Sequence, residues 1–140
     1  MMKDVLIKIK GTQGIDKEEE VIELSTVGKL GIRGDDVLVT YEEPDTVGAK
    51  NVKTHLHFKT PDTIILKRTG QLNSKLVIKK GIRNNCCYVT ALGEMMIGIF
   101  GEQIESNLSE NGGRLVMSYT IDNNLRLVSR NKVEITVIEV

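Results

Sequence analysis

Aromatic residues are scarce in this chain of 140 residues: they make up 4% of it, and tryptophan is absent. Proteins that hold single-stranded nucleic acids stack the bases on exposed aromatic rings, so this scarcity argues against such a platform. A surplus of charge of one sign is lacking too, because 19 basic residues balance 19 acidic ones. Without a basic surplus the electrostatic footprint of a nucleic-acid-binding protein is missing. We therefore expect no nucleic acid among the partners.

Long apolar runs are also missing. The opening residues "MMKDVLIKIK" alternate apolar and charged side chains, whereas a signal peptide needs an unbroken apolar segment and a small-residue cleavage site. No run approaches the roughly 20 apolar residues that a membrane-spanning helix requires. We expect a cytoplasmic protein that does not insert into membranes.

Cysteine is limited to two adjacent residues, Cys86 and Cys87, in "NNCCYV". Neighbouring side chains on a strand point to opposite faces, so these two thiols are badly placed to bridge each other. The simple interpretation is that both thiols are free and that the protein resides in a reducing compartment. A redox or metal-binding pair is the alternative, but it lacks the two-residue spacer of the usual motif.

What the sequence does contain is alternation of apolar and polar residues with a period of two, which is the signature of strands with one buried face. In "DVLIKIK", for example, Val5, Ile7 and Ile9 share one face while Lys8 and Lys10 share the other. The same pattern recurs and predicts ten short strands, within residues 4–10, 19–26, 36–42, 51–59, 62–69, 74–80, 85–92, 94–101, 113–121 and 132–140.

Turn signals rich in glycine and asparagine separate these strands, and such residues supply the positive φ values of tight hairpins. The signals are "GTQG", "RGDD", "TPD", "TGQLN", "GIRNN", "ENGG" and "DNN". Consecutive hairpins without crossover helices predict an all-β fold. We expect a closed antiparallel up-and-down β-barrel of about 8–10 strands, forming a single domain over residues 1–140. Glycines inside the expected strands fit its bulges and bends: Gly28, Gly31, Gly98 and Gly101.

One stretch, "EQIESNLSE", is ambiguous, because its apolar residues Ile104 and Leu108 are four positions apart. That spacing suits one face of a helix and also one face of a strand. We expect a strand.

Both histidines of the chain, His55 and His57, lie in "KTHLHFK" and could hold a metal ion from one strand face. They share this face with Lys53 and Lys59, whose ammonium groups repel a cation. The apolar residues of the stretch occupy the other face, which should point into the barrel. No third histidine exists to complete a zinc site. We expect a solvated strand face, with no metal and no cofactor.

Catalytic motifs are absent as well. The glycines of "TVGKLGIRG" do not match a phosphate-binding loop, and no serine lies in a G-x-S-x-G motif. The sequence therefore indicates no catalytic residues, and we do not expect an enzyme. A hydrolase or metalloenzyme that uses the two histidines is the weakest of three hypotheses.

Three residues on the inward faces are candidate ligand-binding residues: Arg68, Tyr88 and Tyr119. A guanidinium inside a barrel needs a partner, which could be a ligand anion held by its planar fork. Alternatively, Arg68 lies at a strand end and reaches water past the rim. The two tyrosines need hydrogen-bond partners, which could be Arg68, each other or a bound molecule. Alternatively, they are core residues whose hydroxyl groups form hydrogen bonds within the protein.

The stretches "VKTHLHFKTPDTIILKRTGQLNSKLVIKKG" and "YVTALGEMMIGIFGEQIESNLSENGGRLVMSYTI" resemble the YwiB-like family, small bacterial proteins of unassigned function. The resemblance implies a calycin-like β-barrel and brings no catalytic or binding residues with it. Calycins similar to lipocalins and fatty-acid-binding proteins hold small apolar or amphipathic ligands. The chain departs from lipocalins because, without tryptophan, it lacks their G-x-W signature. Ligand carriage is thus an analogy of fold.

Two hypotheses lead. The first is a binding module that holds a small amphipathic ligand in the barrel lumen. The alternative is a non-enzymatic structural or interaction protein, acting as a homodimer through its outer surface. Apolar residues at positions expected to face water could form such an interface: Leu38, Val77, Val89 and Ile138.

Overall fold

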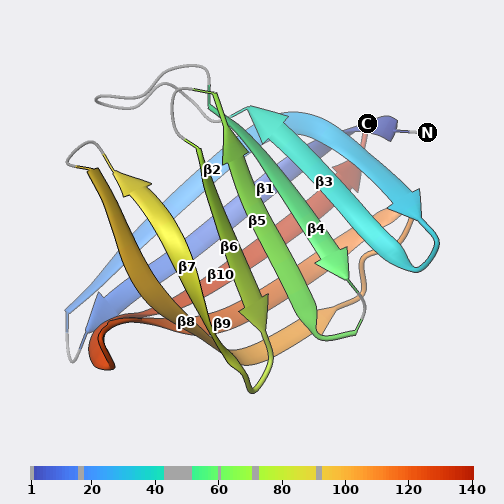
Figure 1. Cartoon of the computed structure of the whole chain (residues 1–140). Coiled ribbons are helices and arrows are strands. Elements are labelled where there is room, and N and C mark those ends of the chain that lie inside the picture. Colours follow the sequence, from blue (N-terminus) through green and yellow to red (C-terminus); the bar gives the residue numbers. More distant parts are fainter. Residues whose placement is uncertain (1, 16–17, 43–51, 60, 71–72, 91–92) are drawn as a thin grey trace.

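Ten antiparallel strands make up the chain in the computed structural model, which describes residues 2–15, 18–42, 52–59, 61–70, 73–90 and 93–140 (Figure 1). The strands are β1 (Met2–Ile15), β2 (Glu18–Arg33), β3 (Asp36–Glu42), β4 (Lys53–Lys59), β5 (Thr63–Thr69), β6 (Ser74–Lys79), β7 (Arg83–Thr90), β8 (Gly93–Ser106), β9 (Gly112–Asn123) and β10 (Arg126–Glu139). Within these ranges no helix is long and apolar enough to cross a bilayer.

The strands form one sheet in the order β6-β5-β4-β3-β2-β1-β10-β9-β8-β7. Every neighbouring pair in this order except β1–β10 is joined directly along the chain. The β1–β10 ladder brings the two termini side by side and curls the sheet around one core (Figure 1). The up-and-down barrel expected from the sequence is confirmed.

A seam between β6 and β7 leaves the barrel nearly closed, because no continuous ladder joins these two strands. Near their connection, the amide of Ile82 donates to the carbonyl of Lys79 at 3.1 Å. Farther along, the amide of Val77 donates to Sγ of Cys86 at 3.4 Å. A thiol side chain therefore takes the place of a backbone acceptor in this part of the seam.

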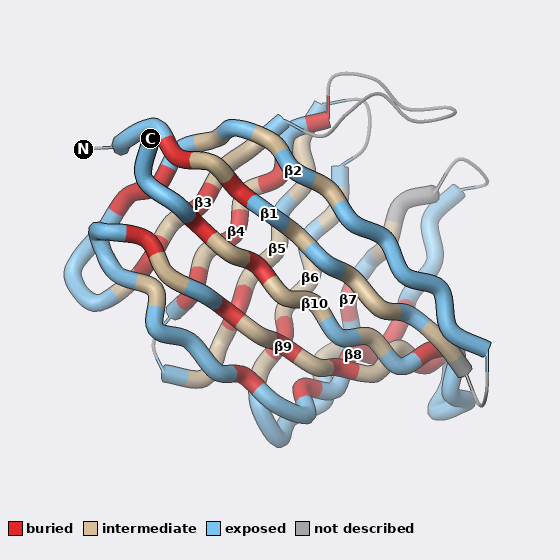
Figure 2. The backbone as a smooth tube through the Cα atoms, turned by 180° about the vertical axis from the view of Figure 1, so that it is seen from behind, coloured by how far each residue is buried: buried red, intermediate tan, exposed pale blue. Residues whose placement is uncertain are grey.

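Burial alternates along most of the strands as the sequence predicts, with inward residues more buried than their outward neighbours (Figure 2). Six of the inward aliphatic side chains are fully enclosed, each 0% exposed: Val5, Ile7, Ile64, Ile78, Ile99 and Leu115. Burial of such a side chain contributes about 1.5–3 kcal/mol relative to leaving it in water. The adjacent thiols separate as expected: Cys86 is buried, Cys87 is exposed and both are free.

Most local expectations hold, with one clear exception. The expected turn "GTQG" lies inside β1, because residues 11–14 pair with β2 on one side and with β10 on the other. The "DNN" turn is shifted, and falls at Asn124 and Leu125, whose φ values are 51° and 68°. The ambiguous stretch continues β8 to Ser106, which confirms a strand there, and Leu108 lies beyond its end. Gly101 borders a bulge in β8, as expected for a glycine inside a strand.

The strand β2 is much longer than its neighbour β3. Only Gly28–Arg33 of β2 pair with β3, whereas β1 accompanies β2 from Glu18 to Gly31. The first ten residues of β2 therefore extend past β3 at one end of the barrel.

Candidate functional site

The odd-numbered strands all run in one direction, so their carboxyl ends meet at one end of the barrel (Figure 1). Four residues with polar groups lie near these ends: Tyr41 on β3, Arg68 on β5, Tyr88 on β7 and Tyr119 on β9. We call this end of the barrel, where these four residues lie, the mouth. It gathers all three tyrosines of the chain.

Polarity rises toward the mouth along the inner wall formed by β3, β4, β5 and β6. Residues opposite each other in these strands form three rows, which in order toward the mouth are Val37, Phe58, Ile64 and Ile78; then Val39, Leu56, Leu66 and Leu76; then Tyr41, Thr54, Arg68 and Ser74. The first two rows are apolar, and the third carries hydroxyl groups and a guanidinium. Tyr41, Thr54 and Arg68 each take part in interactions within the chain.

Of the three predicted ligand-binding residues, Arg68 and Tyr88 both lie close enough to Tyr119 to influence its pKa. Burial raises the pKa of Tyr119, which is 8% exposed. The positive charge of Arg68 acts in the opposite direction on this pKa, and Tyr88 raises it further. Charges act appreciably only over short distances in a hydrated protein, so Arg68, Tyr88 and Tyr119 belong to one group at the mouth. Whether this group binds a ligand stays a prediction.

Apolar side chains accompany these polar groups at the mouth. Ile22 lies on the inward face of β2, opposite Gly11, and is 60% exposed. Met95 lies opposite Tyr88, on the inward face of β8, and is 42% exposed. The mouth is therefore amphipathic, since it combines a cation and phenol hydroxyl groups with apolar surface that water reaches.

The sequence reasoning did not name Tyr41 and Thr54 as site residues, although both lie in the third row with Arg68. Both fall on the apolar face of their strands by simple alternation, so the signal for an inward position was present. The cross-strand register was missing: it places Tyr41 opposite Thr54, and Thr54 opposite Arg68. Hairpin lengths fix this register, and the loop sequence alone does not determine it.

Both histidines lie on the outer face, as expected. Burial, and then the charges of Lys53 and Lys67, lower the pKa of His55, so this ring is neutral at neutral pH. His57 Nε2 lies 3.0 Å from a carboxylate oxygen of Asp36 on β3. Among the described residues, no group of three or more histidine, cysteine or acidic side chains could hold a metal ion.

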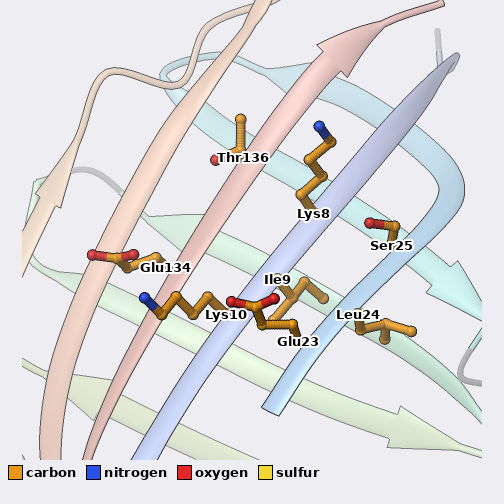
Figure 3. A pocket seen from close by; sticks show the side chains of 8 residues that line it. All are labelled: Lys8, Ile9, Lys10, Glu23, Leu24, Ser25, Glu134 and Thr136. Carbon is orange, nitrogen blue, oxygen red and sulfur yellow. The ribbon is translucent and has the colours of Figure 1, made fainter. Parts of the chain in front are cut away.

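A shallow pocket of about 320 Å³ lies on the wall formed by β2, β1 and β10 (Figure 3). The register places Lys10 between Glu23 and Glu134 there. Glu134 also pairs with Arg114 at 2.9 Å. Opposite charges on neighbouring strands are ordinary stabilising pairs of a solvated sheet face, so we assign no ligand to this pocket.

A bidentate ion pair ties β7 to β9 across β8. The Nε and Nη2 groups of Arg83 donate to the carboxylate of Asp122 at 2.8 and 2.6 Å. The amide of Leu125 donates to the same carboxylate at 3.1 Å, in the β9–β10 turn. The guanidinium lies over Gly98, where any side chain would collide with it. Arg83 holds the pKa of Asp122 below its usual value, so this pair has a structural role.

Taken together, the fold and the mouth define a class: a nearly closed antiparallel barrel with an amphipathic opening at one end. The chain belongs to the family described as "Domain of unknown function (DUF1934)", which matches residues 7–135. This confirms the predicted membership of a family of uncharacterised barrels.

Two comparisons identify a relative from Bacillus subtilis. The chain is 24% identical over 115 residues to the "Uncharacterized beta-barrel protein YwiB" of Bacillus subtilis (strain 168), covering 82% of this chain and 79% of that protein. It is also similar to the crystal structure of ywiB protein from Bacillus subtilis, with a TM-score of 0.87 and 22% identity. That match covers 99% of this chain and 93% of the other. At this level of identity, the structural likeness shows the fold alone.

Proposed function

We propose that this chain is a non-enzymatic binding module that holds one small amphipathic ligand at the mouth and in the adjoining lumen. The observation that carries the proposal is the convergence of Arg68, Tyr88 and Tyr119 at an opening that also exposes Ile22. A planar guanidinium suits an anionic or strongly polar head group, and the apolar side chains suit a hydrocarbon tail. Two free thiols agree with a reducing compartment, so we place the protein in the cytoplasm.

A thermal-shift comparison of decanoate with 1-decanol tests this proposal. A ligand present at 100 times its Kd stabilises the folded state by about 2.7 kcal/mol, which raises the Tm of a domain of this size by several degrees. If Arg68 receives the head group, decanoate should stabilise the protein more than the uncharged alcohol does. No shift with either probe, or with other fatty acids and isoprenoids, would contradict the proposal.

Two substitutions separate the role of Arg68 from a general effect of charge. Arg68→Met should lower the affinity for decanoate by about tenfold or more and leave that for decanol unchanged. Lys67→Met is the matched control, because Lys67 is the adjacent residue, is exposed and faces outward. Arg68→Lys keeps the positive charge but lacks the planar, bidentate guanidinium. It replaces Arg68→Met in the comparison if the methionine variant does not fold. Equal losses in the Lys67 and Arg68 variants would refute the assignment.

The second candidate function is a homodimer that forms through the outer surface. Of the four outward residues expected to contribute, Ile138 is 41% exposed, Leu38 and Val77 are half-buried, and the Val89 side chain lies outside the described residues. Ile138 lies opposite Leu6, and Leu6 lies opposite Val27, which is 70% exposed. This apolar row across β10, β1 and β2 supports an interface, and sedimentation measures whether one forms.

A further inference from the structure

The first half of β2 is an open edge of the sheet. Gly28 is the last residue of β2 toward the mouth that pairs with β3, and within the described chain Glu18–Val27 pair with β1 alone. In Figure 2 this part of β2 forms the border of the sheet. A strand edge of this kind presents a row of backbone N–H and C=O groups that can pair with another extended chain.

This edge is both accessible and held in place. None of the residues from Glu18 to Val27 is buried, and Val21, Ile22 and Val27 are 53%, 60% and 70% exposed. The partner strand β1 accompanies the whole stretch, so the backbone is already extended. Because β2 is already an ordered strand, binding a partner would cost no loss of conformational entropy in β2.

The side chains of the edge fall into two halves of different chemistry. Glu18, Glu19 and Glu20 make the beginning acidic. The rest of the edge is apolar or carries hydroxyl groups, apart from Glu23. A second copy of the chain pairing antiparallel with this edge would set the acidic segment of each copy opposite the apolar segment of the other, so neither acidic segment would meet a basic partner. Charge complementarity therefore favours a basic partner over a second copy.

We propose that the edge from Glu18 to Val27, which we call the β2 edge, binds an extended segment of another protein by strand addition. The segment runs antiparallel to β2. Its amino-terminal half carries β-branched apolar residues opposite Ile22–Val27, and its carboxyl-terminal half carries basic residues opposite Glu18–Glu20. Backbone hydrogen bonds supply the affinity, and the change from apolar to basic along the segment fixes its direction. The segment pairs with the backbone of the β2 edge, next to Ile22, whose side chain is also exposed at the mouth.

The probe for the first experiment is a synthetic peptide of sequence VTITVKIKK with blocked ends, titrated into the full chain. The peptide should bind with an affinity that falls as salt rises, because exposed charges are screened. The reversed sequence KKIKVTITV, which has the same composition and charge, should bind more weakly. The triple variant Glu18→Gln/Glu19→Gln/Glu20→Gln should bind the parent peptide more weakly and with less dependence on salt.

A second experiment separates strand addition from simple charge attraction. In an antiparallel ladder, hydrogen-bonded and non-hydrogen-bonded residues alternate, so only every second amide of the peptide faces the β2 edge. Two peptides are therefore compared, N-methylated on the odd or on the even residues. One should lose about tenfold or more in affinity, because it loses several hydrogen bonds, and the other should bind like the parent.

Three outcomes would overturn the proposal. The first is that the parent peptide does not bind. The second is that both N-methylated peptides bind as tightly as the parent, because charge attraction would then explain all of the binding. The third is a stable dimer in sedimentation that the Ile22→Lys substitution dissociates, because the β2 edge would then belong to a second copy of the chain. The peptide comparisons use the unmodified protein, so a failure of a variant to fold does not affect them.

Discussion

Gly28 lies where the wall of the barrel opens, at the last pair between β2 and β3, and it offers a sharp test of the packing there. A Cβ atom added to Gly28 would lie 2.2 Å from the carbonyl oxygen of Thr40 and 2.6 Å from Cδ1 of Ile7. It would also lie 3.1 Å from Cβ of Tyr41. Ordinary contacts between carbon atoms are about 3.5–4.0 Å, so β3 would have to move by roughly 1 Å. The closest atom belongs to the backbone and cannot rotate away.

The Gly28→Ala substitution should therefore destabilise the protein. Overpacking of this kind costs about 1–3 kcal/mol. For a chain of 140 residues this corresponds to a fall in Tm of roughly 4–12 °C. Thermal unfolding followed by far-ultraviolet circular dichroism measures the change, and urea unfolding gives the free energy independently.

Gly11→Ala is the matched control, on the neighbouring strand and the same inward face. The atom nearest to an added Cβ there is the carbonyl oxygen of Ile22, at 4.0 Å. Replacing a glycine by alanine without strain stabilises a protein by about 0.4–1 kcal/mol, because the unfolded chain loses freedom. The two substitutions should therefore change Tm in opposite directions. A Gly28→Ala protein as stable as the wild type, or equal shifts for both variants, would refute the reasoning.

Two further predictions concern the outer surface. Asp122→Asn should destabilise the protein at pH 7, because Arg83 then loses its ionised partner. Because Arg83 lowers the pKa of Asp122, the wild type loses this stabilisation as pH falls below about 3.9, the value of an unfolded aspartate, and through the lowered pKa. Urea unfolding should therefore show a difference in unfolding free energy between wild type and variant that is smaller at pH 3 than at pH 7. A difference that stays constant would count against this role. If the apolar row on the outer surface forms a dimer, Ile138→Glu should yield folded monomers in sedimentation, and a wild-type monomer at high concentration would remove that interface.

The sequence was sufficient to predict which face of each strand is buried. In "KTHLHFK", alternation places Leu56 and Phe58 inward and the histidines outward, and the structure has the same arrangement. Alternation succeeds here because one face of each strand must be buried, so that only one of the two choices of face is stable.

Strand lengths and closure were less accessible to sequence reasoning. "GTQG" has the composition of a turn, yet β2 and β10 both pair with it, and hydrogen bonding on two sides outweighs the local preference. The seam between β6 and β7 leaves no mark in the sequence either. Cys86 has the pattern of an ordinary inward residue, and only the three-dimensional arrangement shows that its thiol accepts from Val77.

The contrast between the two ends of the barrel interior is the strongest argument that the mouth has a function. At the far end of the wall formed by β3 to β6, the row that includes Phe58 and Ile64 consists of buried apolar side chains. A barrel that served only as a filled scaffold could use the same solution at both ends, since apolar residues of similar volume are as stabilising as buried ionic groups or more so. At the mouth, the same strands instead carry Arg68 beside Thr54, near a nearly buried Tyr119. Partial burial of a guanidinium costs solvation free energy, and an anionic head group would add a charge-assisted interaction to those that Arg68 already makes within the chain.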